Sequence, residues 1–260
     1  MRLDYPFLPE FERASVWLVG AGPGDPGLLS LLGLYALQQC DCLVYDALVN
    51  PHLLELANPR AKLIFAGKRG GRPSSRQDDI CKKLIEEASS NKRCLRLKGG
   101  DPVIFGRAGE EIRALVKAGI RFRVVPGITA AGALIYAGIP LTDRRFNATF
   151  SVATGHGVNG DLPDNINWQA LSDSATVLIF YMALKHLERI VKKLIESGRD
   201  ENESAGLIEH LSMPTQQTRT GRLKDLNVMK NTLKGGPAIV VIGPVVDLRD
   251  VMGWFDPPNV

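Results

Sequence analysis

The chain has 260 residues, of which 45% are hydrophobic and 23% are charged. This is the composition of a globular protein, so a wholly disordered chain is excluded. A chain of this length makes one large domain or two smaller ones, and it buries enough surface to fold without a disulfide or a metal.

Strands and helices alternate through the first half of the chain, which is typical of an α/β fold. Predicted strands cover residues 16–19, 42–45, 61–66, 94–97 and 122–125. Predicted helices cover residues 28–37, 78–89 and 110–118. Several strands run into glycine-rich loops, so we expect a largely parallel sheet with these loops at one edge, where open α/β sheets bind ligands.

The second half of the chain has a different pattern. Predicted strands cover residues 150–153, 176–181, 205–208 and 238–242, a predicted helix covers 186–196, and a polar, turn-rich stretch separates the last two strands. This pattern predicts a smaller α/β domain with a mixed sheet. We expect an N-terminal domain at residues 14–142 and a C-terminal domain at residues 143–250.

The net charge of +4 decides little, but the charge is unevenly distributed. Residues 60–145 hold 19 Lys and Arg against 8 Asp and Glu, so one part of the molecule is basic and could attract an anionic partner. For most of these charges a solvated helix face is explanation enough. The basic residues lack interleaved aromatic side chains and form no continuous run, which argues against a nucleic-acid partner.

The four cysteines are Cys40, Cys42, Cys81 and Cys94, with no CxxC pair and without the spacing of a zinc site. We expect buried thiols and no bound metal. Residues 1–12 lack the apolar segment of a signal peptide, and no apolar run approaches the roughly 18–20 residues of a membrane span. The expected protein is soluble and cytoplasmic, with no membrane partner.

The loop at residues 20–27, Gly-Ala-Gly-Pro-Gly-Asp-Pro-Gly, follows the first strand, and Asp46 ends the second. This arrangement suggests a dinucleotide site and hence a nicotinamide-dependent oxidoreductase. However, the spacing is GxGxG and not GxGxxG, and Pro23 and Pro26 lack the backbone N–H groups that a pyrophosphate needs. A ligand that carries adenosine without phosphate, such as S-adenosylmethionine, fits the loop better.

Two further loops agree with a ligand site. Gly99 and Gly100 leave backbone open beside Asp101, although a tight turn with a helix-capping aspartate explains the same residues. Residues 126–133, Pro-Gly-Ile-Thr-Ala-Ala-Gly-Ala, open a helix with small side chains. They leave room for a ligand near Thr129, or alternatively they permit close packing of that helix.

Several motifs in colinear order, from about Val16 to Val246, resemble the tetrapyrrole (precorrin) methyltransferase family. They are GAGPGDP at 20–26, Asp46, KGGDP at 98–102, FGR at 105–107, PGITAA at 126–131, GIPLT at 138–142 and TGH at 154–156. The resemblance implies that each chain has two α/β domains, with the methyl donor S-adenosylmethionine in an active-site cleft between the domains. It also implies that two chains form a homodimer.

The resemblance also implies a reaction. It is the C-methylation of uroporphyrinogen III at two ring carbons, through precorrin-1 to precorrin-2, for sirohaem or cobalamin, with S-adenosylhomocysteine as by-product. A later precorrin C-methyltransferase of the cobalamin pathway is an alternative within the family. A non-catalytic anion-binding protein is a further alternative, and it leaves the several ligand-like loops unexplained.

Residue by residue, the resemblance implies catalytic and donor-binding roles. Asp46 matches the proton acceptor and Lys68 the proton donor, whereas from the residues alone Asp46 could cap a helix and Lys68 could be a solvated charge. The implied donor contacts are Pro23, Gly99, Gly100, Asp101, Ile104, Thr129, Ala130, Met182 and Leu211. Leu211 stands where family members usually have glycine, so a main-chain contact there requires a backbone angle that suits leucine.

The implied substrate is an anionic tetrapyrrole with eight carboxylate arms. Arginine binds carboxylates through paired hydrogen bonds, so such a substrate would explain the excess of Lys and Arg in residues 60–145. The basic candidates in or beside predicted loops are Lys68, Arg69, Arg72, Arg107, Arg144 and Arg145. We select Arg107, Arg144 and Arg145 as substrate-binding residues, with His156 as a hydrogen-bonding group or part of a structural turn. Asp143 and Gln217 replace a histidine and an arginine that are usual in the family.

Overall fold

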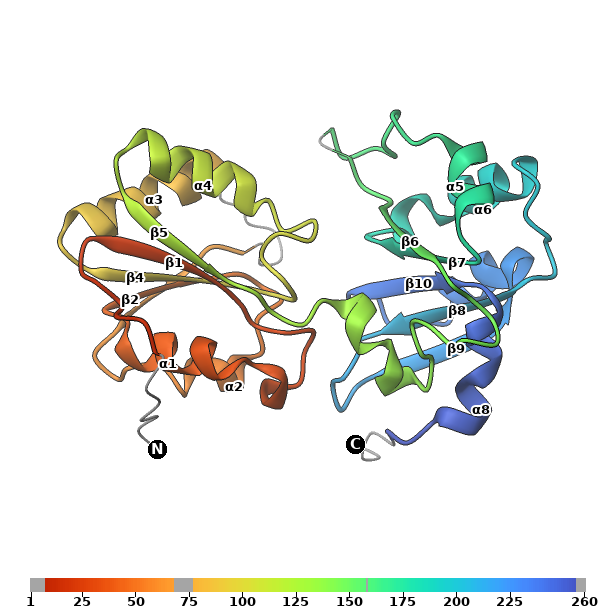
Figure 1. Ribbon diagram of the computed structural model, residues 1–260, viewed down its shortest axis with the longest axis horizontal. Helices are drawn as coiled ribbons and strands as arrows, with labels where there is room; N and C mark the ends of the chain where they lie inside the picture. The colour runs from red at the N-terminus through yellow and green to blue at the C-terminus, as the bar shows by residue number, and fades with distance from the viewer. Residues whose placement is uncertain (1–7, 68–76, 158, 256–260) are drawn as a thin grey trace. The chain divides into compact units, whose positions relative to one another are not determined.

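A computed structural model describes residues 8–67, 77–157 and 159–255, which form two compact units (Figure 1). The units divide between Thr129 and Ala130, upstream of the expected boundary at 142–143. The reason is packing, because Ala131, Leu134 and Ile139 are buried in the core of the second sheet. The chain therefore joins the second unit before it reaches the first strand of that unit.

The first unit contains a five-stranded sheet in the order β3-β2-β4-β1-β5. Its strands are β1 (Ser15–Gly20), β2 (Cys42–Tyr45), β3 (Lys62–Phe65), β4 (Arg93–Lys98) and β5 (Arg121–Val125). All neighbouring pairs are parallel, so the predicted parallel sheet is confirmed. The chain leaves β1 toward β2 but leaves β4 toward β5, so adjacent strands β1 and β4 form the switch point at which open α/β sheets bind ligands.

Helices cover both faces of this sheet (Figure 1). On one face lie α1 (Leu31–Gln39) and α2 (Pro51–Leu54), and on the other lie α3 (Gln77–Ser89) and α4 (Ala108–Lys117). Successive side chains of a strand point to opposite faces of the sheet, so Trp17 and Leu95 pack in one core and Leu18 and Cys94 in the other. The result is a three-layer sandwich whose loops are free to meet at the carboxyl edge.

The prediction of one helix over residues 28–37 is wrong at its start. A short 3₁₀ helix, η1 (Pro26–Leu28), is followed by extended backbone at Leu29 and Ser30. The Ser30 hydroxyl then accepts a hydrogen bond from Gly33 N at 3.0 Å and caps α1, which begins at Leu31.

The second unit contains a five-stranded mixed sheet in the order β6-β7-β10-β8-β9. Its strands are β6 (Phe150–Thr154), β7 (Val177–Tyr181), β8 (Ser204–Glu209), β9 (Gln217–Arg222) and β10 (Ala238–Ile242). The β6–β7 pair is parallel and the other pairs are antiparallel, which confirms the predicted mixed sheet.

Short helices precede, connect and follow these strands. The α-helices are α5 (Trp168–Ser174), α6 (Leu187–Glu196), α7 (Leu226–Lys230) and α8 (Arg249–Met252). The 3₁₀ helices are η2 (Ala130–Ala137), η3 (Leu184–His186), η4 (Leu223–Asp225) and η5 (Pro244–Leu248). The helix predicted to open near residues 126–133 corresponds to η2, which begins at Ala130.

Strand β9 and helix α7 lie in the stretch that the sequence predicts as turns, so that prediction is wrong. The strand reads Gln-Thr-Arg-Thr-Gly-Arg and has no apolar alternation. It forms the edge of the sheet, and none of its residues is buried, so it presents no row of apolar side chains to a core.

All four cysteines are free and buried, as the sequence predicts. Burial, with the nearby Cys42 and Asp41, raises the pKa of the Cys40 thiol to about 12, so this thiol stays protonated and inert. Within the described ranges, no helix has the length and apolar character needed to cross a membrane.

Glu87 on α3 supplies a pH-dependent contribution to stability. It accepts hydrogen bonds from Lys62 Nζ at 2.6 Å and Lys92 Nζ at 2.7 Å. Burial raises the pKa of this carboxyl, but the two lysines outweigh burial and lower the pKa from 4.5 to about 2. The folded state therefore favours the charged form, and the stabilisation is present above pH 4.5 and lost as the pH falls toward about 2.

We expect Glu87→Gln to lower the free energy of unfolding at neutral pH and to matter progressively less in acid. Urea denaturation of both proteins from about pH 6 to about pH 3 measures this difference. A difference that is constant across the range would contradict the assignment.

Candidate active site

Two loops of the first unit are joined backbone to backbone at the carboxyl edge of the sheet. Gly22 N donates to Gly100 O at 3.2 Å, and Gly100 N donates to Gly22 O at 2.7 Å. Ala21 N donates to Lys98 O at 2.8 Å. The loops after β1 and β4 are thus locked together at the switch point between those strands.

Glycine is required where these loops touch. A Cβ on Gly20 would lie 2.5 Å from Gly127 Cα, and a Cβ on Gly127 would lie 2.3 Å from Gly100 O. Gly100 differs, because its φ of +66° favours glycine, yet no atom of the described residues lies within 4 Å of its missing Cβ. The open space beside Gly100 allows a ligand to approach the backbone closely.

Asp101 accepts hydrogen bonds within its own loop and from the loop after β5. Its Oδ1 accepts from Val103 N at 2.8 Å and Ile104 N at 3.2 Å, and its Oδ2 accepts from Gly127 N at 3.1 Å. The side chain is nearly buried. Asp101 therefore closes the tight turn after β4 but does not cap α4, whose N-cap residue is Arg107. Its carboxylate also joins the loop after β4 to the loop after β5.

The other predicted contacts of this unit lie on the same loops. Pro23 is half-buried beside Gly24, whose carbonyl accepts from Asn50 Nδ2 at 2.8 Å. Ile104 is 43% exposed, and Thr129 is half-buried at the end of the loop after β5. The first unit therefore brings Pro23, Asp46, Gly99, Gly100, Asp101, Ile104, Arg107 and Thr129 to the loops of one sheet edge.

Asp46 directly follows β2 at this edge. Its Oδ1 accepts from Leu48 N at 3.0 Å, and its Oδ2 lies 3.7 Å from Arg96 Nη2. The side chain is 23% exposed. The carboxylate thus closes a turn through Oδ1, while Oδ2 faces the Arg96 guanidinium. Lys68, the predicted proton donor, and Arg69 and Arg72 lie outside the described residues.

A buried charge cluster on β4 and α4 was not predicted from the sequence. Arg96 Nε and Lys98 Nζ donate to Glu111 Oε1 at 3.2 and 3.1 Å. Burial first, and then the neighbouring Arg96, lowers the pKa of Lys98. The signal in the sequence is the alternation of charged and leucine residues at 95–98, since a charge inside an otherwise apolar strand must find a partner.

In the second unit, Met182 and Leu211 follow β7 and β8. Both strands run antiparallel to β10, so their carboxyl ends lie at one edge of the sheet. Met182 has φ +52° and is 46% exposed. Ala131 N donates to the hydroxyl of Tyr181 at 2.7 Å, which fastens the start of η2, including Ala130, to the end of β7.

The backbone at position 211 accepts leucine in place of the family's usual glycine. The left-handed residues of this loop are its neighbours, His210 with φ +51° and Ser212 with φ +64°, and Leu211 is not among the positive-φ residues. Ser212 N donates to Gln216 Oε1 at 2.7 Å and fixes the loop. The Leu211 side chain is buried in the core of the second sheet, and the whole residue is 5% exposed.

The predicted substrate residues are dispersed. Arg107 has φ +60° and donates twice to Glu110, at 2.8 and 2.7 Å. Arg145 pairs with Asp143 at 3.2 Å and remains 70% exposed, and Arg144 is exposed. Asn147 joins this turn to Thr149, before β6, whereas His156 follows the carboxyl end of β6. Within the second unit, the two arginines are therefore not grouped with His156 and Met182.

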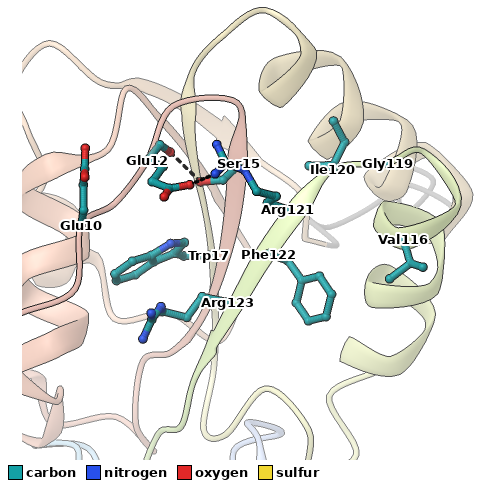
Figure 2. A pocket seen from close by; sticks show the side chains of 10 residues that line it. All are labelled: Glu10, Glu12, Ser15, Trp17, Val116, Gly119, Ile120, Arg121, Phe122 and Arg123. Atoms are coloured by element: carbon teal, nitrogen blue, oxygen red, sulfur yellow. Dashed lines mark hydrogen bonds and ion pairs between the residues drawn. The ribbon is translucent and has the colours of Figure 1, made fainter.

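A hollow at the opposite edge of the first sheet, shown in Figure 2, lies at the amino ends of β1 and β5. Its cations already have partners. Arg121 forms an ion pair with Glu12, and Arg123 stacks over the Trp17 ring at 5.1 Å. The glycine-rich loops lie at the carboxyl ends of the same strands, so this hollow is separate from the candidate active site.

The fold and these loops define a ligand-binding α/β protein whose site is built from backbone at a switch point. No group of three or more His, Cys, Asp or Glu that could hold a metal occurs among the described residues. The lining is instead glycine backbone, apolar side chains and one carboxylate beside buried cations. This lining suits a ligand that has a nucleoside part and no phosphate. The carboxylate suits a reaction that needs a proton acceptor.

Comparison with known proteins identifies the family. Residues 15–227 match the family Tetrapyrrole (Corrin/Porphyrin) Methylases. A uroporphyrinogen-III C-methyltransferase from Sinorhizobium sp is 49% identical over 252 residues, which are 95% of this chain and 89% of that protein. The chain therefore belongs to the tetrapyrrole methylase family and is a methyltransferase, as the motifs predicted.

Longer relatives and solved structures are also tetrapyrrole-modifying proteins or share the fold. A siroheme synthase from Pseudomonas fluorescens (strain SBW25) is 45% identical over 95% of this chain, but the chain spans only 53% of that protein. The crystal structure of a uroporphyrin-III C-methyl transferase from Thermus thermophilus, complexed with S-adenyl homocysteine, has a TM-score of 0.78 and 33% identity, covering 90% of this chain and 99% of that one. A cobalt precorrin-4 methyltransferase, at 23% identity and a TM-score of 0.80, shares the fold.

Proposed function

We propose that this chain transfers methyl groups from S-adenosylmethionine to two ring carbons of uroporphyrinogen III. The products are precorrin-2, formed through precorrin-1, and S-adenosylhomocysteine. The observation that carries the proposal is the 49% identity to a uroporphyrinogen-III C-methyltransferase over nearly the full length of both chains. The product would enter sirohaem or cobalamin synthesis, and the siroheme synthases, of which this chain spans about half, support the sirohaem branch.

The residues present fit the methyl donor. The open space beside Gly100 permits close backbone approach, and Pro23 supplies no N–H donor for a phosphate that this ligand lacks. We propose that Gly99, Gly100, Asp101, Ile104 and Thr129 hold the donor in the first unit, with Pro23. For Ala130, Met182 and the backbone of Leu211 in the second unit, we propose donor contacts on the resemblance to the family alone.

The donor supplies an electrophilic methyl group on a sulfonium, and the electron-rich pyrrole carbon is the nucleophile. The protein must align these atoms and exclude water. Methylation leaves a cationic ring that must lose a proton. Asp46 is the proposed proton acceptor, because its Oδ2 makes no hydrogen bond among the described residues and faces Arg96 at 3.7 Å. Lys68 is the proposed proton donor.

The acidic arms of the tetrapyrrole are proposed partners for Arg107, Arg144, Arg145 and His156. We expect Arg107→Ala to raise the KM for uroporphyrinogen III several-fold and to leave donor affinity unchanged. The KM of the wild-type protein should rise with salt, since exposed charges are screened over about 8–10 Å. Lys117→Ala, at the far end of the same helix, is the control and should leave KM unchanged; equal effects of the two variants would remove Arg107 from the substrate site.

We also propose a cytoplasmic homodimer. Four free, buried thiols are consistent with a reducing compartment, and the homodimer follows from the family resemblance. Light scattering coupled to size-exclusion chromatography measures the oligomeric state directly.

The proposed reaction is tested with isotopically labelled S-adenosylmethionine and uroporphyrinogen III under reducing conditions. Mass spectrometry of the product should show two added methyl groups, with a singly methylated species at early times. Methylation of an already methylated precorrin, with uroporphyrinogen III left untouched, would favour the later step of the pathway. Binding of NAD without binding of either sulfur nucleoside would favour an oxidoreductase.

A further inference from the structure

Strand β4 carries two charged side chains where a sheet core normally has apolar ones. Arg96 is 3% exposed and Lys98 is 5% exposed, and the partner of both, Glu111 on α4, is fully buried. Burying charges is costly unless each is paired and hydrogen-bonded. Such a cluster therefore needs a role that packing by itself does not provide.

The Arg96 guanidinium is fixed on several sides. Its Nε donates to Glu111 Oε1 at 3.2 Å, and its Nη1 faces the carbonyls of Val44 at 3.4 Å and Leu97 at 3.2 Å. These acceptors come from α4, β2 and β4, so the planar group is held by three elements. The remaining nitrogen, Nη2, points to Asp46 Oδ2 at 3.7 Å.

This arrangement sets the direction of the Asp46 carboxylate. Leu48 N holds Oδ1 at 3.0 Å, and the fixed guanidinium faces Oδ2. At 3.7 Å the contact between Asp46 and Arg96 is an ion pair without a hydrogen bond, so Oδ2 keeps its lone pairs for a proton. All of these contacts lie within the first unit.

We propose that Arg96 is a positioning residue that aims Asp46 for proton removal, with Glu111 holding Arg96 in turn. The proposal rests on the proposed function, in which Asp46 accepts the proton released after methyl transfer. Lysine cannot replace Arg96, because a single ammonium cannot engage Glu111, two carbonyls and Asp46 together.

A double-mutant cycle tests this role. Arg96→Lys should lower kcat at least about tenfold in the otherwise unchanged protein, since a misplacement of about 1 Å can cost up to about 10²-fold. In the Asp46→Asn background the same substitution should lower kcat less than about twofold, because the base it positions is already absent. The loss of melting temperature should be no larger in the Asp46→Asn background, where the ion pair is already absent, and donor affinity should not change.

Arg93→Lys is the matched control on the same strand. Arg93 also pairs with an aspartate, Asp41, at 2.9 Å, but at the amino end of β4. It should lower the melting temperature without lowering kcat. If Arg96→Lys does not fold, Glu111→Gln removes the charge that holds Nε, and its loss of kcat should show the same dependence on Asp46.

The outcomes separate the possible failures. Equal losses of kcat from Arg96→Lys in both backgrounds would mean that Arg96 only stabilises the fold, which overturns the positioning role. Near-normal turnover of Asp46→Asn would overturn the proton-acceptor role and, with it, the proposal for Arg96. Absence of methyl transfer by the unmodified protein would instead overturn the proposed function.

Discussion

Asp46→Asn is expected to lower kcat by about 10²- to 10⁴-fold, the range that a positioned general base contributes. Asparagine keeps the shape of the side chain but cannot take up the proton released after methyl attack. Its Oδ1 can still accept the hydrogen bond that Leu48 N gives to Asp46 at 3.0 Å, so the turn after β2 is preserved. Donor affinity should therefore change little, since donor binding transfers no proton.

The alternative for Asp46, a side chain that only caps the turn, leads to the opposite result. Asparagine caps nearly as well as aspartate, so both stability and kcat would remain near normal. Asp41→Asn provides the matched control, because Asp41 stands just before β2 and pairs with Arg93 at 2.9 Å. That variant should lower the melting temperature and leave kcat unchanged.

Turnover at saturating concentrations of both substrates, calorimetric donor affinity and melting temperature together decide the role of Asp46. Single-turnover measurements ensure that the chemical step is observed. A near-normal rate for Asp46→Asn in that assay would remove Asp46 from the mechanism.

Gly100→Ala is expected to weaken binding of S-adenosylhomocysteine by roughly 5- to 150-fold. The added methyl group would project into the open space beside the loop, where the ligand is proposed to lie. Overfilling a packed contact costs about 1–3 kcal/mol, which corresponds to this range in Kd.

Gly119→Ala separates this effect from backbone strain. Gly119 has φ +69°, close to the +66° of Gly100, and a Cβ there also meets no atom of the described residues within 4 Å. It lies just before β5, at the edge of the sheet opposite to the loops. Both variants should lose similar stability, but only Gly100→Ala should lose donor affinity by calorimetry; equal donor affinities would place the ligand elsewhere.

Strands β1 and β2 could be predicted because a strand buried on both faces reads as a continuous apolar run, as at Val16 to Val19 and Cys42 to Tyr45. The glycine-rich loops could also be predicted from the sequence. Backbone contacts at Gly20 and Gly127 leave no room for a side chain, so these positions are glycine. Strand β9 could not be predicted, because none of its residues is buried and its sequence has no apolar alternation.

Most strands and the ligand-like loops were predictable from the sequence, because they depend on local pattern and on side-chain volume. The sequence also carried the family motifs that predicted the methyl donor and the place of Asp46 at the end of a strand. Three features required the folded structure: Asp101 joins two loops, Leu211 needs no left-handed backbone, and Arg96 contacts both Glu111 and Asp46. Arg96 and Glu111 are 15 residues apart, and Arg96 and Asp46 come from different strands. Such contacts form only when a parallel sheet brings separate strand ends to one edge, which no local pattern encodes.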